Sequence, residues 1–156
     1  MSETTPQTQQ QEGQSGEETH RLEAQRRSNR DAAAALGASP YGQRTDGLMS
    51  VAEARRLYDP AADAEHQEKA KDAGHVDRRP SARVAGRVML HRDTGKLIFI
   101  QIRDHTVDPA LEDSKDLQIA VSKRDCDEKG FALAKVCDLG DVIVAEGPLM
   151  KTRTGE

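Results

Sequence analysis

The sequence predicts a mainly β protein, in which a small five-stranded barrel follows a polar and helical first half. Strong β-formers are concentrated after residue 80, whereas Gln, Glu, Ala, Arg and Asp dominate before it. After Pro80, apolar and polar residues alternate with the period of a strand. The chain has 156 residues, of which 35% are hydrophobic and 32% charged, so it can build one modest core.

Three segments are expected: a disordered tail over 1–16, a helical extension and linker over 17–79, and the barrel domain over 80–156. The tail has no apolar residue beyond Met1, so burial cannot offset the entropy lost on ordering it. From Glu17 to Leu36 the composition favours a helix, and Gly37 is a suitable stop signal.

Four arginines lie close together on this first helix, namely Arg21, Arg26, Arg27 and Arg30. Two interpretations stay open: a solvated helix face, or a contact with nucleic-acid phosphates beside the barrel. A second helix should begin at Ser50 and run to Tyr58, because Ser50 and Glu53 have capping-box spacing. Residues 61–79 form a further short polar helix or a linker, and Pro80 marks the domain boundary.

The first strand of the barrel is expected over residues 83–90. Its alternation places Val84, Val88 and Leu90 on one face. Gly86 inside the strand indicates a bulge or a sharp bend. Residues 93–96 read Asp-Thr-Gly-Lys, which predicts a turn and a hairpin to the next strand.

The second strand, over residues 97–103, carries the clearest alternation in the chain. Ile98, Ile100 and Ile102 fall on one face and should form the core, while Phe99, Gln101 and Arg103 point outward. An aromatic ring among polar residues on the outer face of a sheet is typical of a base-stacking platform. The alternative is that Phe99 packs beneath a loop or a helix of the first half.

The remaining elements are a loop, a strand, a helix and a strand. The loop over 105–116 is acidic, but the spacing of its carboxylates fits no calcium loop, so we expect a solvated surface loop and no metal site. A third strand over 117–121 should turn Gln118 and Ala120 outward, and a short helix should cover 125–136. A fourth strand is expected over 142–147, followed by a turn over 151–156.

Three strands, a helix, a fourth strand and no fifth indicate an oligonucleotide-binding (OB) fold, a five-stranded Greek-key barrel, whose fifth strand is truncated here. In this fold the second and third strands carry the ligand face. A barrel without its last strand has an open edge, which favours association of the chain with itself or with a longer partner.

Charge and targeting signals restrict the function further. The net charge is −4 and the sequence pI about 5.8, which argues against gripping nucleic acid by bulk electrostatics. The sequence has no apolar run long enough for a membrane span and no signal-peptide pattern. Cys126 and Cys137 bracket the expected helix, too far apart for a disulfide. Reduced thiols and a cytoplasmic protein without membrane contact are therefore expected.

Several motifs after residue 82 resemble the anticodon-binding domain of class II lysyl-tRNA synthetases. They are Val84-Ala85-Gly86-Arg87, His91-Arg92-Asp93-Thr94-Gly95-Lys96, Arg103-Asp104, Leu117-Gln118-Ile119, Asp138-Leu139-Gly140-Asp141 and Ala145-Glu146-Gly147. The most specific is Lys151-Thr152-Arg153-Thr154-Gly155-Glu156, which separates the lysyl enzymes from their aspartyl and asparaginyl relatives. The Arg-rich helix followed by Pro40-Tyr41 is also similar to the start of that family.

The resemblance implies a set of RNA-binding residues. Phe99 would stack on the central base of a uracil-rich anticodon, and Arg92, Gln118 and Glu146 would contact base edges or the adjacent backbone. Gln101 and Arg103 are outward neighbours that help without being required by the resemblance. For Glu146 the alternative is a structural acceptor inside the barrel.

The resemblance also implies a partner, the anticodon loop of tRNA(Lys), and a parent enzyme that is a homodimer. The residues that bind ATP, Mg²⁺ and lysine in that family lie in a catalytic domain that this sequence lacks. We therefore assign no catalytic residue and no cofactor to this chain, and expect it not to charge tRNA by itself. The alternative to an enzyme's recognition module is a free-standing OB-fold nucleic-acid-binding module.

Overall fold

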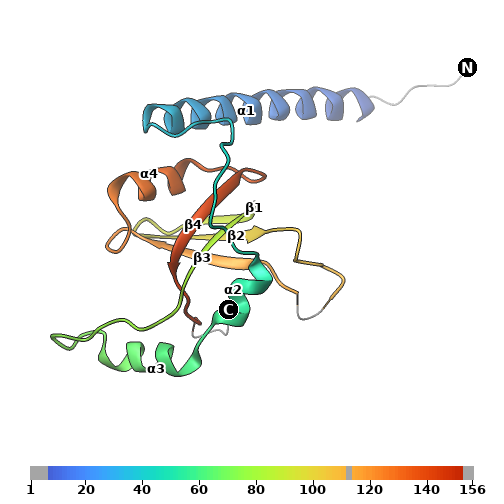
Figure 1. Cartoon of the computed structure of the whole chain (residues 1–156). Coiled ribbons are helices and arrows are strands. Elements are labelled where there is room, and N and C mark those ends of the chain that lie inside the picture. The colour runs from blue at the N-terminus through green and yellow to red at the C-terminus, as the bar shows by residue number, and fades with distance from the viewer. Residues whose placement is uncertain (1–6, 112–113, 153–156) are drawn as a thin grey trace, which may run out of the picture.

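The computed structural model describes residues 7–111 and 114–152, and a single antiparallel sheet forms its centre. Its elements in chain order are α1 (Gln7–Ala35), α2 (Val51–Leu57), α3 (Pro60–Lys69), β1 (Ser81–Asp93), β2 (Leu97–Arg103), β3 (Leu117–Ser122), α4 (Glu128–Val136) and β4 (Val142–Pro148). The strand order is β3-β2-β1-β4, and the sheet curls into a half-barrel (Figure 1). Helices α1 and α4 lie beside one end of this half-barrel, and α2 and α3 lie at the other (Figure 1).

The inner face of the sheet holds the core, as the alternation of β2 predicted. Ile98, Ile100 and Ile102 are at most 1% exposed, while the residues between them are half-buried on the outer face. Val84 and Val88 of β1 and Phe131 of α4 join the same cluster. Burial of these side chains, at roughly 1.5–3 kcal/mol each, is the main force that holds the sheet closed over α4.

The bulge in β1 lies later than Gly86, and this changes which residues face inward. The β1–β2 pairing shifts register between Val88 and Leu90, so the extra residue reverses the phase of the strand. Leu90 is 43% exposed, and the prediction that it faces the core with Val88 was wrong. Gly86 instead permits a close approach, because a Cβ there would lie 3.0 Å from the carbonyl oxygen of Arg103.

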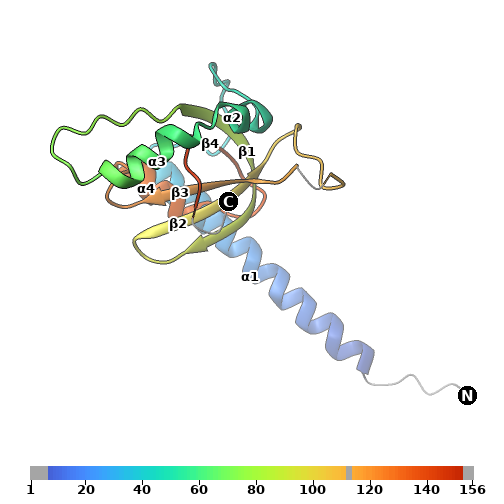
Figure 2. The same cartoon turned by 90° about the horizontal axis from the view of Figure 1, so that it is seen from below.

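Helix α1 begins at Gln7, so the prediction of a disordered tail over 1–16 was wrong for residues 7–16. Gln and Glu have good helix propensity, which favours extension of the helix through this segment although Gly13 and Gly16 oppose it. Residues 1–6 of the predicted tail lie outside the described residues. The predicted stop is confirmed, because Gly37 has a φ of +78° directly after the helix. The N-terminal part of α1 projects beyond the barrel (Figure 2).

Helix α2 is fixed at its N-terminus by its own cap and by the loop after β2. The predicted capping box between Ser50 and Glu53 is confirmed. In addition, the Asp104 carboxylate accepts a hydrogen bond from Val51 N at 2.8 Å, and the Thr106 hydroxyl accepts one from Ala52 N at 3.1 Å. Three of the orphan amides of the helix are therefore satisfied by side chains.

Helix α2 is also part of the core. Val51 and Ala54 are at most 1% exposed, and Ala54 belongs to the cluster that includes Val84 and Val88. The residue pair Met49 and Val84 forms a parallel β-bridge just before the helix. The far end of the β2–β3 loop is fastened to the same helix, because Arg55 donates to the carbonyl oxygens of Lys115 and Asp116 at 2.7 and 2.8 Å.

The cap of α2 gives a first testable expectation. Replacing Ser50 with Ala should lower the free energy of unfolding by about 1 kcal/mol, because the amide of Glu53 loses its acceptor. Gly also lacks the hydroxyl, but without a Cβ it leaves the helix amides open to water, so Ser50→Gly should cost only a few tenths of a kcal/mol relative to wild type. Urea unfolding followed by far-UV circular dichroism measures both, and equal losses in the two variants would contradict the capping role.

Helix α4 begins at Glu128, three residues after the predicted start, because Asp127 caps it by accepting a hydrogen bond from Gly130 N at 2.7 Å. The ring of His91 on β1 reaches the carbonyl oxygen of Ala134 at 2.7 Å. The phase reversal in β1 brings His91 inward, so the bulge itself creates this link between the sheet and α4. Strand β4 follows over almost the predicted range.

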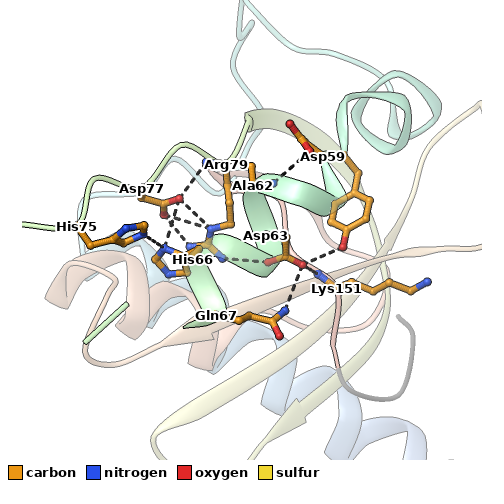
Figure 3. A network of polar contacts seen from close by, with 10 residues as sticks. Asp59, Ala62, Asp63, His66, Gln67, His75, Asp77, Arg79 and Lys151 are labelled. Atoms are coloured by element: carbon orange, nitrogen blue, oxygen red, sulfur yellow. Dashed lines mark hydrogen bonds and ion pairs between the residues drawn. The ribbon is translucent and has the colours of Figure 1, made fainter. Parts of the chain in front are cut away.

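A buried carboxylate joins α3 to the end of the chain (Figure 3). Asp63 is 2% exposed, and its Oδ2 accepts hydrogen bonds from the Tyr58 hydroxyl at 2.9 Å, the Lys151 amide at 3.0 Å and the Gln67 amide at 3.3 Å. Its Oδ1 has no hydrogen bond and lies 3.9 Å from Arg79 Nη1. The Asp63 side chain therefore ties the segment after β4 to α3.

Arg79 links this carboxylate to a second one, Asp77, just before β1 (Figure 3). Arg79 Nη2 lies 2.7 Å from Asp77 Oδ2, and this hydrogen bond holds the pKa of Asp77 well below its usual value. Lys151 is the first residue of the predicted turn over 151–156, of which residues 153–156 lie outside the described residues. Between residues 7 and 152 the edge strands of the sheet are β3 and β4.

Candidate functional site

The outer face of β1, β2 and β3 carries most of the residues that the sequence singled out. The tight turn after Asp93 sets the β1–β2 register, which places Arg92 opposite Phe99. The β2–β3 register places Phe99 opposite Ala120, and Gln101 opposite Gln118. The side chains at these positions, Arg92, Phe99, Ala120, Gln101 and Gln118, are called the outer-face patch below.

The aromatic ring of the patch is paired with a cation. The guanidinium carbon of Arg92 lies 5.0 Å from the ring centroid of Phe99, within the range of a cation–π contact. Ala120 on the other side is small and exposed, so β3 leaves the ring accessible. An arginine plane and an aromatic ring are the two kinds of side chain on which unpaired bases stack.

The amides of the patch are unused within the described part of the chain. Gln101 and Gln118 lie opposite each other and are half-buried, and neither side chain has a hydrogen-bond partner among residues 18–111 and 114–152. Each amide offers both a donor and an acceptor, so the pair can match the edge of a base. The second row of the patch therefore presents hydrogen-bonding groups beside the stacking row.

Arg103 lies next in line on β2 but is committed to a partner. Its guanidinium contacts the Asp116 carboxylate twice, at 2.6 and 3.0 Å. This hydrogen bond raises the pKa of the Arg103 guanidinium, which therefore stays charged, and the carboxylate neutralises it. Arg103 thus fixes the end of the β2–β3 loop against the sheet.

Glu146 is not brought to the patch. It lies on β4 opposite Arg83, near the start of β1, whereas Arg92 lies near the end of that strand. Its carboxylate is exposed and lies 3.5 Å from the Arg83 guanidinium. The alternative of an acceptor inside the barrel is also not what the structure shows, because Glu146 points to the outer face in an exposed ion pair.

The arginines of α1 are largely paired along their own helix. Arg21 and Arg27 lie within 4 Å of Glu18 and Glu23, and Arg30 lies 3.0 Å from Asp31. Arg26 donates to the carbonyl oxygen of Leu139, and Asn29 donates to Asp138, which docks the helix beside α4. These contacts favour the interpretation of a solvated helix face over a phosphate-binding one.

Sequence reasoning missed two hollows that flank the patch. One lies at the far end of β2, beyond Arg103, and includes Arg87, Met89, His105 and Val142. The other lies at the hairpin end of β2 and is lined by Lys96, Leu97, Ser122, Lys123, Arg124 and Asp125. Two lysines at strand ends were the signal for the second hollow, but only the β2–β3 register shows that they are neighbours.

The described residues show no group of three His, Cys, Asp or Glu side chains that could hold a metal ion. Both cysteines are free, and burial raises the pKa of the Cys137 thiol to about 11. Across the same part of the chain, no helix combines the length and apolar character needed to cross a membrane.

Comparison with known proteins places this geometry in a family. Residues 82–156 match the model of the OB-fold nucleic acid binding domain. The chain is 35% identical over 133 residues to the lysine–tRNA ligase of Anaeromyxobacter sp. strain K, which covers 85% of this chain and 23% of the relative. The lysine–tRNA ligase of Staphylococcus epidermidis is 34% identical over 121 residues, 78% of this chain and 21% of that protein.

A third relative has a higher identity over a shorter stretch. The lysine–tRNA ligase of Dehalococcoides mccartyi is 47% identical over 74 residues, which is 47% of this chain and 13% of that protein. The chain thus spans less than a quarter of the length of the curated relatives it matches.

Proposed function

Residues 82–156 belong to the family of OB-fold nucleic acid binding domains, and from this premise we propose that the outer-face patch binds the anticodon loop of a lysine-accepting tRNA. The observation that carries the proposal is the pairing of one stacking row with one hydrogen-bonding row on β1–β3. Arg92 and Phe99 make the first, and Gln101 and Gln118 make the second. The similarity to lysine–tRNA ligases over this region supports the choice of RNA.

The proposed contact assigns a role to each row. A base stacks on the exposed face of the Phe99 ring or on the guanidinium plane of Arg92. A glutamine amide then reads the edge of a uracil, whose carbonyl oxygen accepts where cytosine presents an amino donor. One aromatic residue suits the reading of one base, whereas a general single-strand binder uses several stacking platforms.

The overall charge of −4 agrees with a reader of this kind. Non-specific binding to nucleic acid is driven by many cations that release counterions from the phosphates. Here Arg83 and Arg103 are paired with carboxylates, and Arg87 donates to the backbone carbonyl oxygen of Gly140. The affinity for RNA must therefore come from a few local contacts, which makes each of them measurable by substitution.

Replacing Phe99 with Ala should weaken binding to an anticodon stem–loop bearing UUU by about 1–3 kcal/mol, or roughly 5- to 150-fold, because the stacking platform is lost. The same variant should abolish the preference for UUU over a stem–loop with UCU. Fluorescence anisotropy titration at a fixed, stated salt concentration measures both quantities.

The matched control is Tyr41→Ala, which removes an exposed aromatic side chain from the linker before α2. It should bind both loops as wild type does. If wild type binds UUU and UCU equally and Phe99→Ala changes nothing, the chain is a general nucleic-acid-binding module instead of an anticodon reader.

The same proposal includes the larger protein in which this RNA binding would act. The ligation of lysine to tRNA belongs to the relatives by name, and we propose that this chain serves such a ligase as its tRNA-recognition module. ATP and Mg²⁺ would then act in a catalytic domain outside the residues described. A homodimeric ligase in the cytoplasm fits two free thiols, because disulfides form in oxidising compartments.

A further inference from the structure

The hollow at the hairpin end of β2 lies directly beside the stacking row. Leu97 pairs with Ser122, and the next outward pair along the same two strands is Phe99 with Ala120. At about 3.4 Å per residue, the two pairs are roughly 7 Å apart. The amide of Lys123 donates to the carbonyl oxygen of Lys96 at 2.9 Å, which holds the two lysines next to each other at the strand ends that line this hollow.

The hollow is lined by positive charges that neighbouring carboxylates do not neutralise within the described part of the chain. Lys96 and Lys123 are exposed, and neither ammonium group has an ion-pair or hydrogen-bond partner among the residues that the structure describes. Arg124 is engaged with Asp125 at 3.0 Å, so those two charges cancel locally. Two free cations therefore remain at the end of a sheet face in a chain whose net charge is negative.

The hollow at the opposite end of β2 differs in this respect. Arg87 donates to the carbonyl oxygen of Gly140 at 2.7 Å, and Arg103 is held by Asp116. Both arginines that line it are already bound within the protein. Of the two hollows, only the one at the hairpin end is therefore lined by side-chain cations that have no partner among the described residues.

We propose that Lys96 and Lys123 bind the RNA backbone phosphates next to the base that stacks on Phe99, and so fix the register of the loop on the sheet. This proposal rests on the proposed function. Lysine ammonium groups bind phosphate as point charges and carry no sequence information. Leu97 and Ser122 between them offer a half-buried apolar and hydroxyl floor, which suits a sugar better than a second base.

The double variant Lys96→Gln/Lys123→Gln tests this assignment. Binding of the UUU and UCU stem–loops is titrated between 50 and 200 mM salt for this variant and for wild type. Each phosphate contact in a single strand contributes about 0.7 to the slope of log affinity against log salt, so the slope should become shallower by about 1.4. Over that fourfold range wild type should then lose about 7-fold more affinity than the variant.

The control is Lys71→Gln/Lys129→Gln, which makes the same change in net charge at exposed positions away from the patch. It should keep the wild-type slope to within about 0.3. The Lys96/Lys123 variant should weaken UUU and UCU by the same factor, so that the preference between them is unchanged. Urea unfolding of each variant confirms that these surface changes leave the fold intact.

A slope equal to that of the control variant would overturn the proposal, and so would a changed preference between the two loops, because that result means base contact. The proposed function fails separately, when wild type shows no preference and Phe99→Ala has no effect. A shallower slope in that case still assigns the two lysines to phosphate. Absence of any RNA binding at 50 mM salt overturns both.

Discussion

Replacing Asp63 with Ala should lower the free energy of unfolding by about 3 kcal/mol, the largest loss expected from any polar substitution in the chain. The change leaves the Lys151 amide and the Tyr58 hydroxyl without their acceptor in a site that is 2% exposed. It also removes one of the two carboxylates that face Arg79. Urea unfolding followed by circular dichroism measures the loss.

Asp63→Asn is the matched control, because it keeps one oxygen that accepts from Lys151 and Tyr58 and replaces the other with an uncharged amino group. Its loss should be about 1 kcal/mol, since Asp77 still neutralises Arg79. The pKa of Tyr58 is a second quantity to measure, because burial and then the hydrogen bond to Asp63 raise it in the wild type. In Asp63→Ala the Tyr58 pKa should move down towards its usual value. An unfolding loss below about 1 kcal/mol in Asp63→Ala would show that the network adds little.

Replacing Ile100 with Ala should cost about 4 kcal/mol, because it opens a cavity at the centre of the sheet. Ile100 is 1% exposed and lies on β2, between His91 of β1 and Ile119 of β3. Neighbours on a paired strand cannot collapse into the space without breaking ladder hydrogen bonds, so little of the loss is recovered. Chemical denaturation gives the value, with a native-like slope in urea as the sign that the fold survives.

Two neighbouring substitutions bracket this result. Ile100→Val removes one methylene and should cost about 1 kcal/mol. Gln101→Ala changes the adjacent outward-facing side chain and should alter stability by less than about 0.5 kcal/mol. If Gln101→Ala destabilises the chain as much as Ile100→Ala, the assignment of the two faces of β2 is wrong.

The success of sequence reasoning on β2 has a simple cause. Seven residues alternate without interruption, so the inner and outer faces follow from the strand period alone. The hairpin between β1 and β2 was predicted from its turn, and this short turn fixes the register that the structure shows, with Arg92 opposite Phe99. The capping box at Ser50 is equally local, and it too was predicted from spacing.

The errors concern features that depend on other parts of the chain. The extra residue between Val88 and Leu90 reverses the strand phase, and its position is set by the pairing partners and not by a local glycine. The location of Glu146 is equally non-local, because the β1–β4 register places it opposite Arg83, while its assignment to RNA binding stays a prediction. The burial of Asp63 needs partners from four separate places in the sequence, namely Tyr58, Gln67, Arg79 and Lys151.

The phosphate-binding lysines show the same limit. The local sequence gives the position of Lys96, which is the last residue of the predicted hairpin turn. Its neighbour Lys123 comes after the β2–β3 loop, and only the long-range β2–β3 register places it there. No local pattern gives that register, because the loop between the strands is long and its length is not a turn signature. The candidate RNA residues of β2 were thus predictable, and the charged border of the site was not.

The contacts between α2 and the β2–β3 loop show that the cooperative folding unit is longer than the segment that matches the family. The match begins at residue 82. Yet Ala54 belongs to the core, and Asp104 and Thr106 hold the amides at the start of its helix. A chain shortened to the matched segment would leave Asp104 without the Val51 amide and uncover the apolar surface beneath Ala54. Helix α2, although it lies in the polar first half of the sequence, therefore covers part of the barrel core.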